Sequence, residues 1–326
     1  MADVAKVAGV SPMTVSRVLN GFPGVTEETR LLVESAVAAL DYRSNTAARI
    51  LAGGRSRSLG VIAVETQQFG PSQMLFGLEA AAREAAHTLH FVTLRQSERN
   101  EIPTVLEHLR DLHVEGAIII APVRKVIDAI TDLQPQLPLV IAGGDPTIGT
   151  ATVTIDQYEG ARLATEHLLG LGHATVHHVS GPRTWIDATE RIRGWRDALA
   201  AHDARSGKLH VGDWSAQRGY VIGQRLAKDP GVTAIFAAND QTALGVLRAL
   251  QEGGRAVPDD VSLVGFDDTP ESGFYLPPLT TVRQDFAEVG RRCVQLLLSQ
   301  LGHKEREHHD TIPVALVRRG SAAAPA

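Results

Sequence analysis

The sequence predicts an α/β protein in which a small helical head precedes two lobes, each built on a doubly wound parallel sheet. Three observations support this fold class. The first 40 residues contain three short amphipathic segments with helical spacing. From Leu59 onward, compact apolar runs alternate with amphipathic helical segments, a pattern typical of parallel sheets covered by helices on both faces. These units are too many for one small sheet, so we expect two lobes, with ligands between them near the carboxyl ends of the strands.

Length and composition are those of a globular protein with full hydrophobic cores. The chain has 326 residues, 44% hydrophobic and 21% charged, which allows two or three domains. Its one cysteine, Cys293, excludes an intrachain disulfide and lies in the apolar stretch VGRRCVQLLL, where a buried thiol is expected. No signal peptide precedes Asp3, and no run of about 18 apolar residues could span a membrane. The sequence therefore predicts a cytoplasmic protein.

The charge is distributed unevenly along the chain. The net charge is −5, which by itself does not favour nucleic-acid binding. Residues 1–57, however, hold seven Lys and Arg against five Asp and Glu, a net +2, which leaves −7 for the remainder. This asymmetry suits a small DNA-facing head on an acidic body that repels phosphate.

The stretch DVAKVAGVSPMTVSRVLN predicts two short helices joined by a tight turn. Gly9 is expected to end the first helix, and Ser11 to cap a second that starts at Pro12. The second helix should bury Val15, Val18 and Leu19 and leave free Met13, Thr14, Ser16, Arg17 and Asn20. Short polar groups and one Arg suit a helix that enters a DNA major groove. An ordinary helical hairpin with a hydrated face is the alternative.

A third helix and an unusual segment complete the head. Thr26 is the expected cap of the third helix, whose buried face should comprise Leu32, Val33, Ala36, Val37 and Leu40. The segment 46–52 that follows reads as a very short helix between Asn45 and a Gly-Gly pair. Because so short an isolated helix is unstable in water, this segment either needs a partner or is a flexible linker.

The remaining chain alternates between strands and helices. Strands are expected over 60–64, 90–94, 116–122, 137–144, 151–155, 174–181, 232–240 and 261–268. Helices are expected over 74–86, 105–112, 126–133 and 157–169, around Trp195, and up to Leu250.

Polar side chains gather directly after several expected strands. Asn239 and Asp240 follow one strand, and Asp267 and Asp268 follow another. Gln284, Asp285 and Phe286 follow the strand near LTTVR, Arg191 lies in the helix after HHVSGP, and Trp214 lies in a loop. A carboxylate, a guanidinium, an amide and an indole face are what a neutral, hydroxyl-rich ligand requires. Each residue taken singly could instead cap a helix or hold a turn. Their shared position at strand ends favours a common site.

Catalytic chemistry has little support in the sequence. There is no phosphate-binding loop of the Walker type and no G-x-S-x-G motif. His173, His177 and His178, like His308 and His309, lack the spacing of a metal site. The sequence therefore predicts no catalytic residues, no cofactor and no metal.

Nearly the whole chain resembles the lactose repressor family of bacterial transcription regulators. DVAKVAGVSPMTVSRVLN is similar to the family's helix-turn-helix, and NTAARILAG to its hinge helix. Its effector-domain signatures are matched by EHLLGLGHATVHHVSGP, GW at 194–195, ANDQTALGVLRAL, DDVSLVGFDDT and PPLTTVRQDFAEVG. PSQM at 71–74, GDWSA at 212–216, ANDQTALG at 238–245 and YLPPLTTVRQDF at 275–286 are closest to the protein after which the family is named.

The resemblance implies a homodimer whose two heads read a pseudo-palindromic operator. Pro12 and Met13 match the two base-reading positions, and Leu51 matches a hinge leucine that wedges into the minor groove. The DNA-contacting set implied is Pro12, Met13, Thr14, Ser16, Arg17, Asn20, Asn45, Ala48, Arg49 and Leu51. The family's leucine-heptad tail is absent from the end VALVRRGSAAAPA, so a dimer is expected rather than a dimer of dimers.

The resemblance also implies an effector pocket in a periplasmic-binding-protein-like domain. The matching positions are Pro71, Met74, Asp187, Arg191, Trp214, Asn239, Asp267, Gln284 and Phe286. Three positions depart from the protein that gives the family its name: Ala142 replaces an aspartate, with Asp145 nearby, and Val64 and Asp187 each replace a serine. These departures leave the identity of the sugar open.

The implied domains are a helix-turn-helix domain over 1–44, a hinge helix and linker over 45–58, an effector-binding and dimerisation domain over 59–320, and a tail over 321–326. The first lobe would comprise about 59–155 and 284–309, and the second about 156–283 and 310–320. The expected function is repression of sugar-utilisation genes, relieved by a sugar or glycoside such as a β-galactoside. The alternatives are a purine-like co-repressor, a sugar-binding transport protein and a sugar-converting enzyme.

Overall fold

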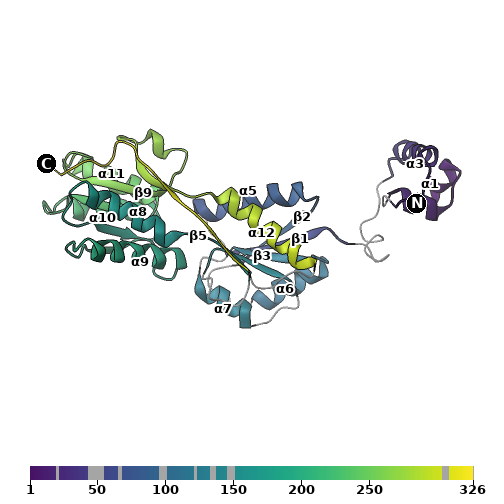
Figure 1. Cartoon of the computed structure of the whole chain (residues 1–326), viewed down its shortest axis with the longest axis horizontal. Helices are drawn as coiled ribbons and strands as arrows, with labels where there is room; N and C mark the ends of the chain where they lie inside the picture. Colours follow the sequence, from purple (N-terminus) through teal and green to yellow (C-terminus); the bar gives the residue numbers. More distant parts are fainter. Residues whose placement is uncertain are drawn as a thin grey trace. The chain divides into compact units, whose positions relative to one another are not determined.

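The chain forms two compact units in a computed structural model, Met1–Ser56 and Arg57–Ala326 (Figure 1). The structure describes residues 1–19, 22–42, 55–64, 68–94, 101–120, 123–132, 137–144, 151–302 and 308–325. Outside the described residues lie Asn20, Asn45, Ala48, Arg49, Leu51 and Asp145, together with the short helix expected over 46–52.

The first unit is a three-helix head with a small apolar core. It contains α1 (Ala2–Ala8), α2 (Pro12–Leu19) and α3 (Glu27–Ala39). Gly9 ends α1 in the left-handed conformation, with φ 68°, as predicted. Both predicted caps are present, because Thr14 N donates to Ser11 Oγ at 3.1 Å and Thr29 N donates to Thr26 Oγ1 at 3.4 Å.

Three leucines predicted to be buried in the head are exposed. Leu19 is 36% exposed, Leu32 50% and Leu40 42%, whereas Val33 and Ala36 are buried. Three short helices enclose only a narrow core, so an apolar residue at the margin of a helix face stays in solvent. The prediction was wrong at these positions because helical spacing gives the direction of a side chain but not the width of the buried stripe.

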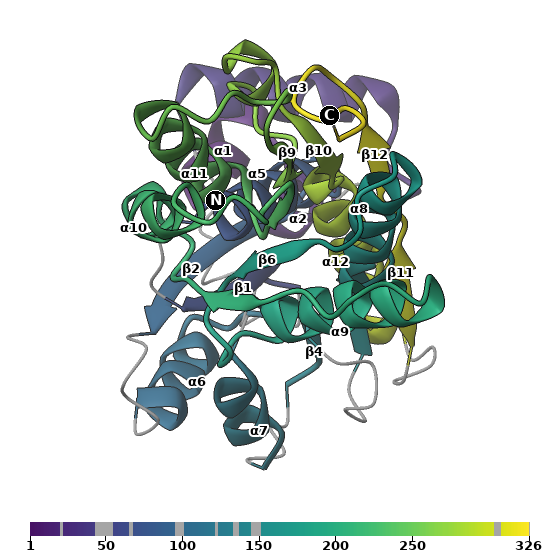
Figure 2. The same cartoon turned by 90° about the vertical axis from the view of Figure 1, so that its left-hand side faces the viewer.

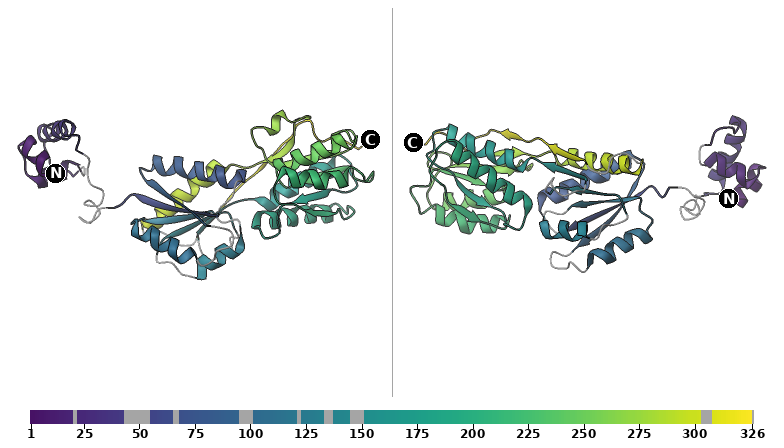
Figure 3. Two further views of the ribbon diagram at one scale, coloured as in Figure 1. Left: turned by 180° about the vertical axis from the view of Figure 1, so that it is seen from behind. Right: turned by 60° about the horizontal axis from the view of Figure 1, so that its bottom comes forward.

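The first lobe of the second unit is a six-stranded parallel sheet with helices on both faces. Its strand order is β11-β5-β4-β3-β1-β2. The strands are β1 (Ser58–Val64), β2 (Thr88–Leu94), β3 (Gly116–Ile120), β4 (Leu139–Ala142), β5 (Ala151–Ile155) and β11 (His309–Ile312). Helices α5 (Phe69–Glu84) and α12 (Phe286–Leu301) pack on one face, and α6 (Glu101–Asp111) and α7 (Arg124–Asp132) on the other (Figure 3).

The second lobe has a sheet of the same size, with the order β12-β10-β9-β8-β6-β7. The strands are β6 (His177–Ser180), β7 (Leu209–Val211), β8 (Ala234–Ala237), β9 (Ser262–Asp267), β10 (Thr280–Arg283) and the antiparallel β12 (Ala315–Val317). Helices α8 (Gln157–Gly170) and α9 (Ile186–Ala201) cover one face, and α10 (Ala216–Leu226) and α11 (Asp240–Glu252) the other (Figure 2). A short 3₁₀ helix, η1 (Ser272–Phe274), follows β9.

Three segments connect the lobes. The chain crosses after β5, after β10 and after β11. Because β11 pairs with β5 over His309–Ile312, it belongs to the first lobe, so the last piece of the second lobe starts after Ile312 rather than near residue 310. The connections bring the carboxyl ends of both sheets to the junction between the lobes.

The predicted fold class is confirmed, and so is the burial of Cys293, which has no exposed surface. The central strands β3, β4, β5, β8 and β9 are buried along their whole length, as strands covered on both faces must be. The sequence pattern did not predict β7 or α10. None of the helices in the described part of the chain is long and apolar enough to cross a membrane.

Candidate functional site

The exposed side of α2 carries the side chains predicted to contact DNA. Pro12, Met13 and Arg17 are exposed, Met13 to 70%, whereas Thr14 and Ser16 are half-buried. The first turn of α2 has no acidic residue, and Arg17 lies in its last turn. Val15 and Val18 anchor the opposite side in the core of the head. DNA contact by these five residues stays a prediction.

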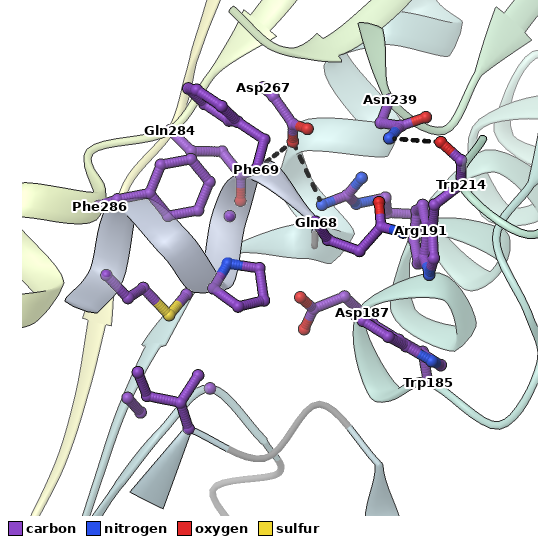
Figure 4. Close-up of a pocket in the computed structure, with 16 residues that line it drawn as sticks. Gln68, Phe69, Trp185, Asp187, Arg191, Trp214, Asn239, Asp267, Gln284 and Phe286 are labelled. Carbon is purple, nitrogen blue, oxygen red and sulfur yellow. Dashed lines mark hydrogen bonds and ion pairs between the residues drawn. The ribbon is translucent and has the colours of Figure 1, made fainter. Parts of the chain in front are cut away.

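The second unit contains a pocket between its two lobes, which we call the inner pocket (Figure 4). All nine residues predicted to bind an effector line it: Pro71, Met74, Asp187, Arg191, Trp214, Asn239, Asp267, Gln284 and Phe286. They come from helices α5, α9 and α12, from the end of strand β9, and from the loops that carry Trp214, Asn239 and Gln284. That they bind a ligand remains a prediction, but the structure brings all nine to one place.

Four buried side chains form a closed ring on the side of the second lobe, which we call the buried ring. Gln284 Nε2 donates to Asp267 Oδ1 at 2.6 Å, and Gln157 Nε2 donates to Gln284 Oε1 at 2.8 Å. Arg191 Nε donates to Gln157 Oε1 at 2.8 Å, and Arg191 Nη2 lies 3.9 Å from Asp267 Oδ1. Each member fixes the orientation of the next, so their remaining polar atoms meet a ligand in a preset arrangement.

Arg191 is held from several sides. Its Nη1 donates to the carbonyl of Ala238, and its guanidinium lies 3.8 Å from the ring centroid of Phe266 and 5.3 Å from that of Trp214. Burial lowers the pKa of Arg191, while Asp267 and Asp187 oppose that shift. A guanidinium fixed in this way can donate to ligand oxygens without losing side-chain entropy on binding.

Asn239 and Trp214 are tied together. Asn239 caps α11 by accepting from Thr242 N at 3.0 Å, and its Nδ2 donates to the carbonyl of Trp214 at 3.1 Å. Trp214 has φ 73°, in the left-handed region, so this bond holds a backbone conformation that a tryptophan rarely adopts. Its ring packs edge-on against Trp185 with centroids 5.4 Å apart. The structural and binding interpretations of Asn239 are therefore compatible.

The wall contributed by the first lobe is mainly apolar. Its side chains are Phe69, Pro71, Met74, Ile120, Ala142 and Phe286, with the amide of Gln68 beside them. Phe69 and Phe286 pack edge to face with centroids 5.8 Å apart. A ligand would thus meet hydrogen-bonding groups on the second lobe and C–H surface on the first.

Three neighbouring aspartates differ in the pKa of their carboxyl groups. Burial raises the pKa of Asp267 to about 8 despite the attraction of Arg191, and burial raises the pKa of Asp240 to about 6 despite bonds from Thr281 and Thr269. Burial also acts on Asp268, but hydrogen bonds from Arg319 and Arg283, each at 2.6 Å, lower its pKa overall. Asp267 is therefore largely protonated near neutral pH, and Asp268 is ionised.

Sequence reasoning missed several residues of the site. Gln157 belongs to the buried ring, and Trp185 belongs to the pocket wall. Gln68 and Phe69, which also line the pocket, lie at the start of α5. Gln157 lies two residues after the end of β5, so the rule that ligands meet strand ends could have indicated it. Gln68, Phe69 and Trp185 carry no such signal.

His173 and His178 make hydrogen bonds within the second lobe. His178 is fully buried, its Nδ1 lies 2.9 Å from the carbonyl of Phe236, and burial lowers its pKa to about 3. His173 bonds to Thr233 and to the carbonyl of Ala323. Among the described residues, no group of three or more potential ligands is placed to hold a metal ion.

Asp267 should make the stability of the second lobe depend on pH. An aspartate in the unfolded chain loses its proton near pH 4, whereas Asp267 keeps it to about pH 8. The contribution of protonated Asp267 to the free energy of unfolding is therefore fully present below pH 4. Between pH 4 and pH 8 this contribution falls by about 1 kcal/mol per pH unit. Asp267→Asn removes the titration, so we expect the variant to gain stability relative to the wild-type protein between pH 5 and pH 7.5 in urea unfolding. A difference that is independent of pH would contradict the prediction.

The comparisons with known proteins follow the division into two units. Residues 1–45 match the profile described as "Bacterial regulatory proteins, lacI family", and residues 165–322 match the periplasmic binding protein-like domain. The chain is 34% identical to the lactose operon repressor of Escherichia coli strain K12, over 99% of this chain and 90% of that protein. It is 32% identical to the transcriptional repressor PurR of Mannheimia succiniciproducens, over 97% of each. The solved Lac repressor dimer, bound to operator and the anti-inducer ONPF, superposes with a TM-score of 0.92 at 33% identity, covering 99% of this chain and 98% of that one.

Proposed function

We propose that a small sugar or glycoside controls how tightly this protein binds operator DNA. The premise is that the chain belongs to the lacI family of bacterial regulatory proteins and is a DNA-binding transcriptional repressor. The observation that carries the proposal is the buried ring of Arg191, Gln157, Gln284 and Asp267 beside the indoles of Trp185 and Trp214. Fixed donors and acceptors next to flat apolar faces suit a ring that carries hydroxyls around its edge and C–H groups on its faces.

The head supplies the DNA contact in this proposal. Pro12 and Met13 would reach base edges, and Thr14, Ser16 and Arg17 would reach phosphates or base edges. Asn20, Asn45, Ala48, Arg49 and Leu51 would add contacts from positions outside the described residues. The similar Lac repressor binds its operator as a dimer, which supports a homodimer here.

The two sites are proposed to be coupled through the lobes. A ligand that contacts both walls of the inner pocket favours one arrangement of the lobes, and a lobe movement would change the spacing of two heads in a dimer. Coupling between distinct sites is typically worth about 1–3 kcal/mol, a change in DNA affinity of about 5- to 150-fold.

The purine-like co-repressor remains the second candidate, because the chain is similar to PurR over almost its whole length. Both ligand classes would use Arg191, Asn239 and an indole face. The apolar first-lobe wall is compatible with either. The direction of the response separates the two candidates: a co-repressor strengthens DNA binding and an inducer weakens it.

Two substitutions test the division of labour. The DNA probe is a duplex selected from a randomised pool. Arg17→Ala should weaken binding to this duplex by about tenfold or more, because a charged contact is lost, and should leave sugar binding unchanged. Asp267→Ala should abolish the response to sugar while DNA binding by the free protein persists. Fluorescence anisotropy of the duplex measures the first effect, and calorimetry with sugars and with adenine and guanine measures the second.

Arg205→Ala, which removes an exposed charge that lies neither in the head nor in the lining of the inner pocket, is the matched control and should change neither property. If either Arg17→Ala or Asp267→Ala abolishes both activities in a folded protein, the proposed separation of sites is incorrect.

A further inference from the structure

We propose that the head recognises thymine in its operator through the C5-methyl group of the base, and that Met13 makes this apolar contact. The inference deepens the DNA contact proposed for α2, on which it rests, by naming the chemical feature of the base that specifies the binding site. It follows from the direction of the Met13 side chain and from the hydrogen-bonding groups around it at the start of α2.

Met13 points almost directly away from the core of the head. At 3.6 residues per helical turn, its side chain lies about 170° around α2 from the mean direction of Val15 and Val18. These two valines are buried in the core of the head, whereas Met13 is 70% exposed. Recognition helices contact base edges in the major groove with the residues at their start. If α2 enters the groove in this way, Met13 is the side chain that it brings to the bases.

The polar side chains of the first turn bond to one another. Ser11 Oγ accepts from Thr14 N at 3.1 Å and lies 2.9 Å from Thr14 Oγ1, so the two hydroxyls share a hydrogen bond. Pro12 has no backbone N–H and no polar side-chain atom. The first turn therefore presents chiefly the exposed apolar surface of Pro12 and Met13 to a base edge.

A methionine side chain distinguishes bases by their apolar surface. It has no hydrogen-bond donor, and its thioether sulfur is only a weak acceptor. In the major groove, adenine, guanine and cytosine present hydrogen-bonding groups, whereas thymine adds a C5-methyl group beside its carbonyl oxygen. Contact with that methyl group buries apolar surface, but the same contact with another base desolvates donors or acceptors and leaves them without partners. Met13 therefore favours thymine.

Arg17 is the one charged side chain of α2 and has a different role. It lies four residues after Met13, so it projects from the same side of the helix about 6 Å further along the axis. Its exposed guanidinium can bond to a phosphate or to guanine. Neither contact distinguishes thymine from the same base without its methyl group, so a requirement for the methyl group reports on Met13 and not on Arg17.

Replacing thymine with uracil tests the inference, because this exchange removes only the C5-methyl group. The probe is a duplex selected from a randomised pool, in which each thymine is replaced in turn at the symmetric positions of the two half-sites. We expect at least one such replacement to weaken binding by the wild-type protein by about fifteenfold, since one buried methyl group in each half-site is worth a factor of about four. Fluorescence anisotropy of the duplexes measures the affinities.

Two variants assign the contact to Met13. Met13→Ala should bind the thymine duplex about tenfold more weakly than the wild-type protein and should prefer it to the uracil duplex by less than about threefold, because the contact with the methyl group is lost. Met13→Leu keeps an apolar side chain of similar size and a high helix propensity, so it should prefer thymine by about fivefold or more.

Leu31→Ala, which removes a 56% exposed apolar side chain from α3, is the matched control and should prefer thymine as strongly as the wild-type protein does. Equal affinity of the wild-type protein for thymine and uracil at every position, or a preference above about threefold that persists in Met13→Ala, would overturn the inference while leaving the proposed function standing. If no duplex is selected from the pool, the DNA contact proposed for α2 is itself contradicted.

Discussion

Gly245→Ala is expected to destabilise the second lobe by about 3 kcal/mol or more. Gly245 lies where α11 crosses α10, and a Cβ at this position would overlap the carbonyl oxygen of Ala216 and come within 2.6 Å of Tyr220 N. Both obstacles are backbone atoms of a packed helix, so they cannot turn aside as a flexible side chain would. Overpacking a core usually costs about 1–3 kcal/mol, and a clash with backbone belongs at or above the top of that range.

Urea unfolding followed by tryptophan fluorescence measures this effect, because Trp185, Trp195 and Trp214, the three tryptophans of the chain, all lie in the second lobe. Gly170→Ala at the end of α8 is the matched control: no atom lies within 4 Å of the added Cβ, so its higher helix propensity should leave stability unchanged or raise it by up to about 1 kcal/mol. Equal stabilities for the two variants would show that α10 can move away from α11 at little cost.

Arg191→Met should lower the free energy of unfolding of the second lobe by about 3–5 kcal/mol and abolish effector binding. Arg191 is 4% exposed and donates to Gln157 Oε1 and to the carbonyl of Ala238. Methionine fills a similar volume but leaves both acceptors without a donor. Removing one partner from a buried, hydrogen-bonded charge cluster typically costs this much.

The same unfolding assay measures the change, and calorimetry with the tightest-binding sugar measures the loss of binding. Arg193→Met, two residues later on α9, is the control. The Arg193 side chain is 55% exposed and pairs with Glu190 at the surface, so its removal should cost at most about 1 kcal/mol. A loss of less than about 1 kcal/mol in Arg191→Met would mean that the buried ring rearranges around the gap.

Periodicity predicted most of the second unit because its strands are covered on both faces. Runs such as GAIII over β3 and ATVTI over β5 are buried throughout and bounded by turns, so a local pattern identifies them. The same reasoning failed for α10. Gly219 and Gly223 lower the helix propensity of that segment, yet both lie against α11, where a Cβ would meet Thr242, Val246 or Ala249. The helix propensity of this segment is therefore low, but its packing against α11 requires it to be a helix.

The candidate site was accessible to sequence reasoning only in part. Asn239 and Asp267 follow or end strands of the second sheet, and parallel strands place such residues at one edge. Pro71 and Met74 are implied only by the family resemblance. Gln68, Phe69 and Trp185 follow no local rule, because they enter the pocket only after the two lobes meet.

The sequence by itself determined most of the order of elements, the two mainly parallel sheets, the caps at Ser11 and Thr26 and the polar groups at strand ends. Each of these follows from interactions between residues close together in the chain. The tertiary structure alone decided the buried ring that joins Gln157 to Gln284 and the opposite protonation of Asp267 and Asp268. A hydrogen bond between residues 127 positions apart, and the exclusion of solvent around it, exist only once the second lobe has folded.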